Sequence, residues 1–217
     1  MPPEKTPRGD PSREAIASLR GYVYQIYQSA LAWTELKDDE LLYLEVAEDF
    51  AVVAEGALKA VQVKNTAGRV TINSEDIIAT IESFVELQEK NPSLKVTLRY
   101  LTTSAITKEK NRDHRIGDAP TLDAWRNLAK AGELSGLRQV LDKSKLSKKS
   151  KDFVKSLDDK GLRERFLKRI HFDCGAPDPD LITRRINSRI SKLLTNRGGD
   201  NSQTQNCVAN ILLTVLN

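Results

Sequence analysis

The stretch LEVAEDFAVVAEGALKAVQVKNT, residues 44–66, sets the order of the central elements of the chain. The runs DFAVV (49–53) and LKAVQVK (58–64) have the length and the branched side chains of β-strands, and Glu55-Gly56 between them forms a turn. The run LLYLEV (41–46) predicts a strand before them in the same antiparallel meander. Gln62 and Lys64 interrupt the apolar pattern. Because side chains alternate along a strand, we expect both to project from one face and Val61 and Val63 from the other.

The segments on either side of the meander have helical periodicity. Residues 12–33 predict a helix with Ser12 as N-cap, and Gln25 lies on a polar stripe of it. Residues 71–92, TINSEDIIATIESFVELQEKNP, predict a second helix capped by Asn73 or Ser74 and ended by a proline. KVTLRYLTTS (95–104) alternates as a half-buried strand does. Its connection is long enough for a crossover that lays this strand parallel to an earlier one.

The order helix, three strands, helix, strand predicts an α/β fold with a mixed central sheet. Beyond residue 108 the pattern is largely helical, with a possible strand at IHFDC (170–174) and a later helix opened by Asp178 and Pro179. We therefore divide the chain into a flexible leader (1–11), a core (12–110) and a helical part packed on that core (111–217). The apolar run before residue 217 leads us to expect a natural chain that continues.

The composition is that of a globular protein of 217 residues with a net charge of +4, and no apolar run is long enough to span a bilayer. The N-terminus lacks the apolar segment of a signal peptide, so we expect a cytoplasmic protein. Two cysteines without CxxC spacing argue against a zinc site or a disulfide framework.

Charge is distributed unevenly along the chain. Residues 35–90 hold 13 acidic and 5 basic side chains, whereas residues 138–169 hold 12 basic and 5 acidic ones. Such a chain could bring a polyanion to carboxylates that hold cations. Alternatively, the basic run KSKLSKKSKDF (143–153) is only a solvated face.

Asp49 begins the strand before the one that carries Gln62 and Lys64. If these strands pair through the turn near Gly56, Asp49 and Lys64 lie close to opposite each other. The carboxylate of Asp49, the amide oxygen of Gln62 and the carbonyl of Val63 are hard oxygen ligands suited to Mg²⁺. Lys64 would then stand beside an attacking water whose pKa the metal lowers, which predicts a site of phosphodiester hydrolysis.

Each of these residues also has a structural interpretation. Asp49 could cap the strand turn, and Glu45 and Glu48 could be solvent carboxylates rather than supporting members of the site. Gln62 and Lys64 could form the outer face of an exposed sheet, where lysine protects an edge. Gln25 could be a surface residue of its helix.

Residues 19–108 resemble the PD-(D/E)XK nuclease superfamily, in which an acid heads one strand and (E/D/Q)-x-K follows on the next. The motif here is Asp49 and then Gln62-Val63-Lys64. More narrowly, GYVYQ (21–25), EVAEDF (45–50), VQVKNT (61–66) and LTTS (101–104) are together similar to the nuclease domain of bacterial antiphage effectors. These include DNA endonucleases activated by cyclic oligonucleotides and the nuclease heads of STAND-type NTPases.

The resemblance implies a restriction-endonuclease-like core in which Asp49 and Gln62 bind Mg²⁺, or Mn²⁺ in its place, Lys64 is catalytic and Gln25 reaches toward the site. Gln62 departs from the commoner acid, and one charge fewer should weaken metal binding. The resemblance also implies cleavage of double-stranded DNA with little sequence specificity, a homodimer or higher oligomer, and a sensor module C-terminal to the chain or in trans. Basic side chains would grip the phosphate backbone, and the candidates are Lys145, Lys148, Lys149, Lys151, Arg184, Arg185 and Arg189.

Three other functions compete with this one. The chain could be a non-catalytic nucleic-acid-binding or adaptor domain on the same fold, which would bind DNA without cutting it. It could be an RNase on that fold. It could also be a protein-binding module whose helical half makes the contacts.

Overall fold

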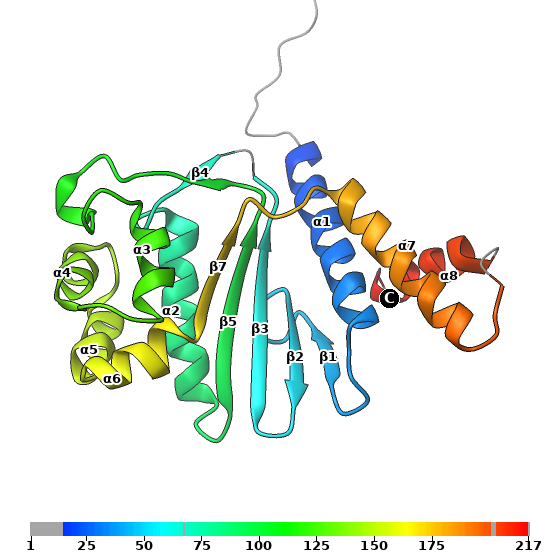
Figure 1. Ribbon diagram of the computed structural model, residues 1–217, viewed down its shortest axis with the longest axis horizontal. Helices are drawn as coiled ribbons and strands as arrows, with labels where there is room; N and C mark the ends of the chain where they lie inside the picture. Colours follow the sequence, from blue (N-terminus) through cyan, green and yellow to red (C-terminus); the bar gives the residue numbers. More distant parts are fainter. Residues whose placement is uncertain (1–14, 67, 201–202, 217) are drawn as a thin grey trace, which may run out of the picture.

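The computed structural model describes residues 15–66, 68–200 and 203–216 and shows a mixed α/β fold (Figure 1). The predicted leader and the predicted cap Ser12 lie outside the described residues. A 5-stranded sheet in the order β1-β2-β3-β5-β7 forms the centre. The predicted fold class is confirmed, including its mixed central sheet.

The strands of the sheet follow the sequence pattern closely. β1 pairs with β2, and β2 with β3, in antiparallel fashion, whereas β3–β5 and β5–β7 are parallel pairs. A separate ribbon of β4 and β6 lies at the end of the molecule where β3 and β5 end (Figure 1). The strands are β1 Leu41–Leu44, β2 Phe50–Ala54, β3 Ala57–Lys64, β4 Arg69–Val70, β5 Lys95–Thr102, β6 Ala105–Ile106 and β7 Ile170–Cys174.

Helices cover both faces of the sheet. α2 begins after Ser74, as predicted, and Asp178 caps α7 by accepting a hydrogen bond from the backbone N–H of Leu181. The α-helices are α1 Ala15–Thr34, α2 Glu75–Lys90, α3 Thr121–Leu128, α4 Ser135–Lys143, α5 Lys148–Ser156, α6 Asp159–Leu162, α7 Pro179–Asn196 and α8 Thr204–Leu216, with a 3-10 turn at Arg112–His114 and a π-helical turn at Arg163–Leu167. No described helix is both long and apolar enough to cross a membrane.

Alternation along β3 divides the interior into two cores. Leu58 and Ala60 face the core under α2 and the helices that follow it, where Phe84, Trp125 and Phe166 are almost wholly buried. Val61 and Val63 face the smaller core under α1, α7 and α8. Gln62 and Lys64 therefore belong to the α2 side of the sheet, on the same face as each other, as the alternation predicts.

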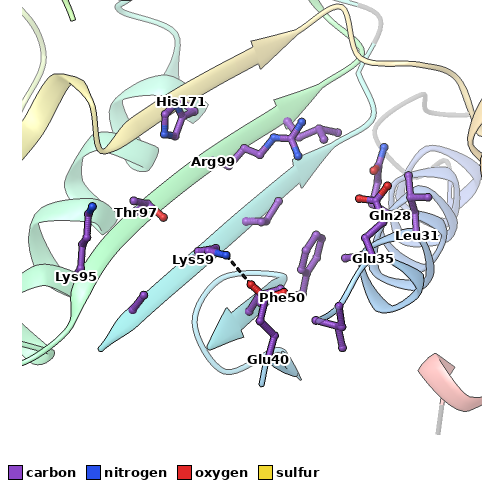
Figure 2. Close-up of a pocket in the computed structure, with 17 residues that line it drawn as sticks. Gln28, Leu31, Glu35, Glu40, Phe50, Lys59, Lys95, Thr97, Arg99 and His171 are labelled. Atoms are coloured by element: carbon purple, nitrogen blue, oxygen red, sulfur yellow. Dashed lines mark hydrogen bonds and ion pairs between the residues drawn. The ribbon is translucent and has the colours of Figure 1, made fainter. Parts of the chain in front are cut away.

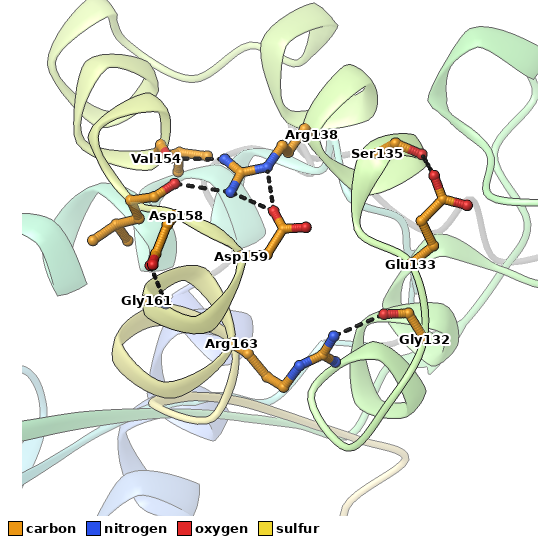
Figure 3. Close-up of polar contacts among 10 residues, drawn as sticks. Gly132, Glu133, Ser135, Arg138, Val154, Asp158, Asp159, Gly161 and Arg163 are labelled. Carbon is orange, nitrogen blue, oxygen red and sulfur yellow. Dashed lines mark hydrogen bonds and ion pairs between the residues drawn. The ribbon is translucent and has the colours of Figure 1, made fainter.

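Arginines in the basic half of the chain hold the helical part together (Figure 3). Arg138 on α4 donates from Nη2 to the carbonyl of Leu157 at 2.8 Å and pairs with Asp159 at 2.8 Å. Arg163 donates to the carbonyls of Leu128 and Gly132. These side chains join α4, α5, α6 and the end of α3, so part of the positive charge between residues 138 and 169 serves packing.

The sequence pattern did not predict the strands β4 and β6, nor the place of β7 in the central sheet. The two-residue strands β4 and β6 are too short to show any periodicity. The predicted strand IHFDC is β7, and it extends the central sheet beside β5. The helical half of the chain thus contributes a strand to the same sheet as the first half.

Candidate active site

The polar residues of the central stretch meet where β2 begins and β3 ends. The register pairs Phe50 with Val61, and its continuation puts Asp49 level with Gln62. Asp49 is therefore two residues from the position directly opposite Lys64, across the tight turn expected at Glu55-Gly56. Gln62 and Lys64 share the α2 side of the sheet, whereas Asp49 precedes β2 and lines a cleft with residues of α1.

Asp49 is fixed by the backbone of the neighbouring strand. Its Oδ2 accepts the N–H of Val63 at 2.5 Å, and the described residues form no hydrogen bond with Oδ1. Burial raises the pKa of Asp49, and the charges of Glu45 and Glu48 raise it further, while the Val63 hydrogen bond and the charge of Lys64 act in the opposite direction. A cation beside Oδ1 would relieve this accumulation of negative charge.

The loop between β1 and β2 directs its two glutamates to opposite sides. Glu45 and Glu48 have positive φ angles of 55° and 66°, and among the described residues other than glycine they alone do. Glu45 accepts a hydrogen bond from Gln25 on α1, and Glu48 accepts one from Ser83 on α2. Because residues other than glycine disfavour this conformation, the contacts to both helices hold the loop in its shape.

Gln25 on α1 lies beside the carboxylates of Glu45 and Asp49. A small cleft of about 50 Å³ is lined by Gln25, Glu45 and Asp49, together with Tyr22 and Ser29. Gln25 reaches the site through its hydrogen bond to Glu45 and forms none with Asp49. Its place in the structure is that of a positioning residue.

Gln62 contacts α2 through its amide. Its Oε1 lies 2.7 Å from the hydroxyl of Thr80, and that hydroxyl also lies 2.7 Å from the carbonyl of Asp76. A hydroxyl has one hydrogen, so it donates to one of these acceptors at a time. When the Thr80 hydroxyl donates to the Asp76 carbonyl, the Gln62 amide can rotate so that its NH₂ group donates to the Thr80 oxygen. Oε1 is then free to bind a cation.

A row of polar side chains on α2 completes the site, and the sequence analysis did not identify it. Asp76, Thr80 and Ser83 are spaced four and three apart, so they share one face of the helix. Asp76 accepts a long hydrogen bond, 3.5 Å, from the hydroxyl of Tyr100. Thr80 is fully buried within the apolar stripe of α2. The feature of the sequence that could have identified this row is the threonine within the apolar stripe of α2.

Lys64 has no opposing carboxylate in contact. Among the described residues its ammonium forms no ion pair, although its charge acts on Asp49. Lys59 on the same strand points to the other face and pairs with Glu40 at 2.7 Å. The free ammonium near Asp49 is therefore available to a substrate anion.

The donor set suits a hard cation. Asp49, the Gln62 amide oxygen and the Val63 carbonyl are oxygen ligands, and Mg²⁺ typically takes one or two carboxylates and completes its shell with water and phosphate. No group of three His, Cys, Asp or Glu side chains in the described ranges is arranged to hold a metal on its own. The residues fit an ion that is held partly by substrate.

The basic residues expected to bind DNA do not form one surface. Lys148 and Lys149 lie on α5. Lys148 pairs with Asp152 of the same helix at 2.8 Å, and Lys149 pairs with Glu89 of α2 at 2.6 Å. Arg184, Arg185 and Arg189 lie on α7, which is on the other side of the sheet from α5 (Figure 1). Lys145 differs from these, because its backbone N–H contacts Asn73, just before α2. The lysines of α5 and the arginines of α7 thus lie on opposite sides of the sheet, so DNA on one side could contact only one of these two groups.

A much larger cavity, about 580 Å³, opens on the α1 side of the sheet (Figure 2). Lys59, Lys95 and Arg99 project into it from β3 and β5 (Figure 2). None of the residues in the predicted site lines it. The polar groups that converge at the end of β3 therefore lie outside this cavity.

Comparisons with known proteins identify the family and the fold. The sequence model of the family described as "Cap4, dsDNA endonuclease domain" matches residues 16–217. No curated protein matches the chain. A solved structure of the Acinetobacter baumannii Cap4 SAVED/CARF-domain containing receptor with the cyclic trinucleotide 2'3'3'-cAAA has the same fold, with a TM-score of 0.52 at 14% identity. The likeness covers 90% of this chain and 40% of that receptor.

Proposed function

Since the chain belongs to the Cap4 dsDNA endonuclease domain family, we propose that it hydrolyses phosphodiester bonds of double-stranded DNA, with Mg²⁺, at the ends of β2 and β3. The observation that carries this proposal is the geometry of one strand pair. Asp49 is fixed on the Val63 N–H and is level with Gln62, and Lys64, which forms no ion pair with any described residue, projects from the same face of β3 as Gln62. This is the arrangement expected of a PD-(D/E)XK nuclease.

Each side chain has a distinct task in this reaction. Asp49, through Oδ1, and Gln62, through Oε1, would hold the cation together with the Val63 carbonyl. When bound, Mg²⁺ supplies Lewis-acid polarisation of the scissile phosphate and lowers the pKa of water. The ammonium of Lys64 orients the attacking water and stabilises the charge that develops on the phosphate oxygens. Glu45, Glu48 and Gln25 position the loop that carries Asp49.

The biological setting follows from the family. We propose a nuclease domain of a bacterial antiphage effector that acts in the cytoplasm under the control of a sensor module. The A. baumannii receptor supports this, because it joins a domain of this fold to a separate domain within a longer chain. Cutting both strands of DNA requires two sites, so we propose that a homodimer or higher oligomer is the active form, with Mn²⁺ able to replace Mg²⁺.

Cleavage of supercoiled plasmid at rising protein concentration, in Mg²⁺ or EDTA, tests the proposal. Lys64→Ala should lower the rate by about 10²–10³-fold, the usual effect of removing a group that stabilises transition-state charge. Lys59→Ala is the matched control, since it removes the same group from the other face of the same strand. It should cut as the wild type does.

Other results would point to a different function. Cutting by Lys64→Ala at the wild-type rate, or cutting in EDTA, would place the chemistry elsewhere. Preference for RNA over duplex DNA would make the domain an RNase on this fold. DNA binding without cutting at any concentration would make it a binding module.

A further inference from the structure

A second groove lies at the same end of the molecule as the candidate site. Its volume is about 590 Å³, close to that of the cavity on the α1 side. One wall is the chain from β4 to the start of α2, and the other is the chain that follows β6. It is lined by Arg69, Thr71, Asn73, Ser74, Thr107, Lys108, Glu109, Lys110, Asn111 and His114.

The walls of the groove are held by the β4–β6 ribbon and a buried acid. The parallel pairing of the two strands continues in a hydrogen bond from the Thr107 N–H to the Val70 carbonyl at 2.9 Å. Glu109 is 4% exposed and accepts the N–H groups of Ile72 at 3.3 Å and Thr121 at 3.2 Å. Its carboxylate is thus turned into the protein, where it fixes the two walls to each other and to the start of α3.

The groups that remain in the lining favour an anion. Arg69 and Lys110 are exposed and form no ion pair with any described residue. Lys108 pairs at 3.1 Å with Asp118, a fully exposed carboxylate, and such pairs are weak and easily exchanged. Hydroxyl and amide groups fill the spaces between the cations, and the one ring in the lining is the imidazole of His114, with no Phe, Tyr or Trp beside it. Cations with hydroxyls and without a large stacking platform suit phosphates rather than bases.

The groove continues the polar row of the candidate site. Ser74 occupies the N-cap position of α2 and lines the groove, and Thr80 on the same helix touches Gln62. The rise along the helix between Thr80 and Ser74 is about 9 Å at ~1.5 Å per residue. At ~3.4 Å per base pair, this length corresponds to about three steps along duplex DNA.

We propose that this groove binds the phosphate backbone of the duplex that is being cut, about three base pairs from the scissile bond. The inference rests on the proposed function, since it assigns a further contact to the same substrate. Arg69 and Lys110 make the contacts to phosphate oxygens, and Lys108 joins them by exchanging Asp118 for the DNA. Together they hold the strand so that its scissile phosphate reaches Lys64.

Binding of a fluorescent 30-base-pair duplex, measured by anisotropy in EDTA over a range of salt concentrations, tests the inference. All proteins carry Lys64→Ala, so that the duplex stays intact, and a gel checks that it does. The Arg69→Ala/Lys110→Ala double variant should bind about tenfold more weakly, and its slope of log K against log salt should fall by about 1.8, which is two phosphate contacts. Lys59→Ala/Lys95→Ala removes two charges from the opposite face and should leave the slope unchanged.

Comparison of the two double variants shows whether the groove contacts DNA. Equal slopes for both, with unfolding temperatures that match the parent, would overturn the groove assignment even if wild-type protein cuts DNA. If the groove double is unfolded, Lys110→Ala alone should still lower the slope by about 0.9, and an unchanged slope would overturn the inference. Failure of the proposed function appears separately, as absence of plasmid cutting by the wild type in Mg²⁺.

Discussion

The two faces of the central sheet are packed differently. The α2 face is sealed: Phe84 is fully buried and its ring packs against that of Phe166 with centroids 5.9 Å apart. The α1 face keeps a cavity of about 580 Å³ between the helix and the strands. The candidate site belongs to the margin of the sealed face, where Thr80 and Gln62 hydrogen-bond within the packed interior. The site thus combines a packed, hydrogen-bonded surround with the negative charge that gathers around Asp49.

The largest expected effect compares one residue type on the two faces. Phe84→Ala should lower the free energy of unfolding by about 4 kcal/mol, because it leaves a cavity in a closed core. Phe50→Ala should cost at least ~1 kcal/mol less, since Phe50 already borders the open cavity and has fewer contacts to lose. Urea unfolding of the two variants measures the difference. Equal losses would show that the two faces are equally packed.

The second effect concerns Glu82, which ties α2 to α5 on the sealed face. Its carboxylate accepts hydrogen bonds from the N–H and the hydroxyl of Ser147, at 2.6 and 2.7 Å, and from the hydroxyl of Ser150. Glu82→Gln turns one acceptor into a donor, so it should cost about 2 kcal/mol. Thermal unfolding at pH 7 measures this loss, with Glu86→Gln on the exposed side of the helix as the control.

The pH dependence of that loss has a definite sign. Burial alone would raise the pKa of Glu82, but the hydrogen bonds from Ser150 and Ser147 outweigh burial and hold the pKa below its ordinary 4.5. A lowered pKa means that the stabilisation is complete above pH 4.5 and is lost as the pH falls through the folded-state value. The difference between wild type and Glu82→Gln should therefore shrink below pH 4.5. A difference that grows on acidification would contradict the assignment.

The third effect sharpens the position of the cation. Gln62→Glu adds a negative charge beside Asp49, so the Mg²⁺ concentration at the midpoint of a thermal-shift titration should fall about tenfold, or ~1.4 kcal/mol. In EDTA the same variant should unfold at a lower temperature than the wild type, because two carboxylates then repel each other. Thr97→Glu adds the same charge on the open face and should leave the Mg²⁺ midpoint unchanged. A midpoint that shifts equally for both variants would mean a diffuse charge effect.

Much of the fold could be predicted because its signals are local. The meander, α2 and β5 each have a period and end signals within a single segment, Ser74 stands at the predicted N-cap position of α2, and Asp178 caps α7 with its side chain. The exact register of β2 and β3 depends on how tightly Glu55-Gly56 turns, so the sequence places Asp49 close to Lys64 without fixing that it is level with Gln62. The place of β7 in the sheet depends on a partner more than 60 residues away, so no local pattern indicates it.

The candidate site was half predictable for the same reason. Asp49 and Lys64 break an apolar pattern, and such a break is visible in sequence. Thr80 and Ser83 lie on an amphipathic helix, where polar residues are ordinarily solvent-facing, and their role becomes visible only when α2 is laid on β3. The groove proposed to bind phosphate joins segments on either side of α2 and β5, and the two-residue strands and the buried Glu109 bring them together.

The smallest expected effect tests whether the open face matters at all to this domain. Arg99 on β5 pairs with Asp173 on β7, and the side chains are 52% and 42% exposed. Solvent screens such a pair, so Arg99→Gln should change the free energy of unfolding by less than about 1 kcal/mol. Because Arg99 points away from Lys64, plasmid cutting should stay within about twofold of the wild type. A large loss of cutting with unchanged stability would mean that DNA reaches the α1 side, and the assignment of chemistry to one face would fail.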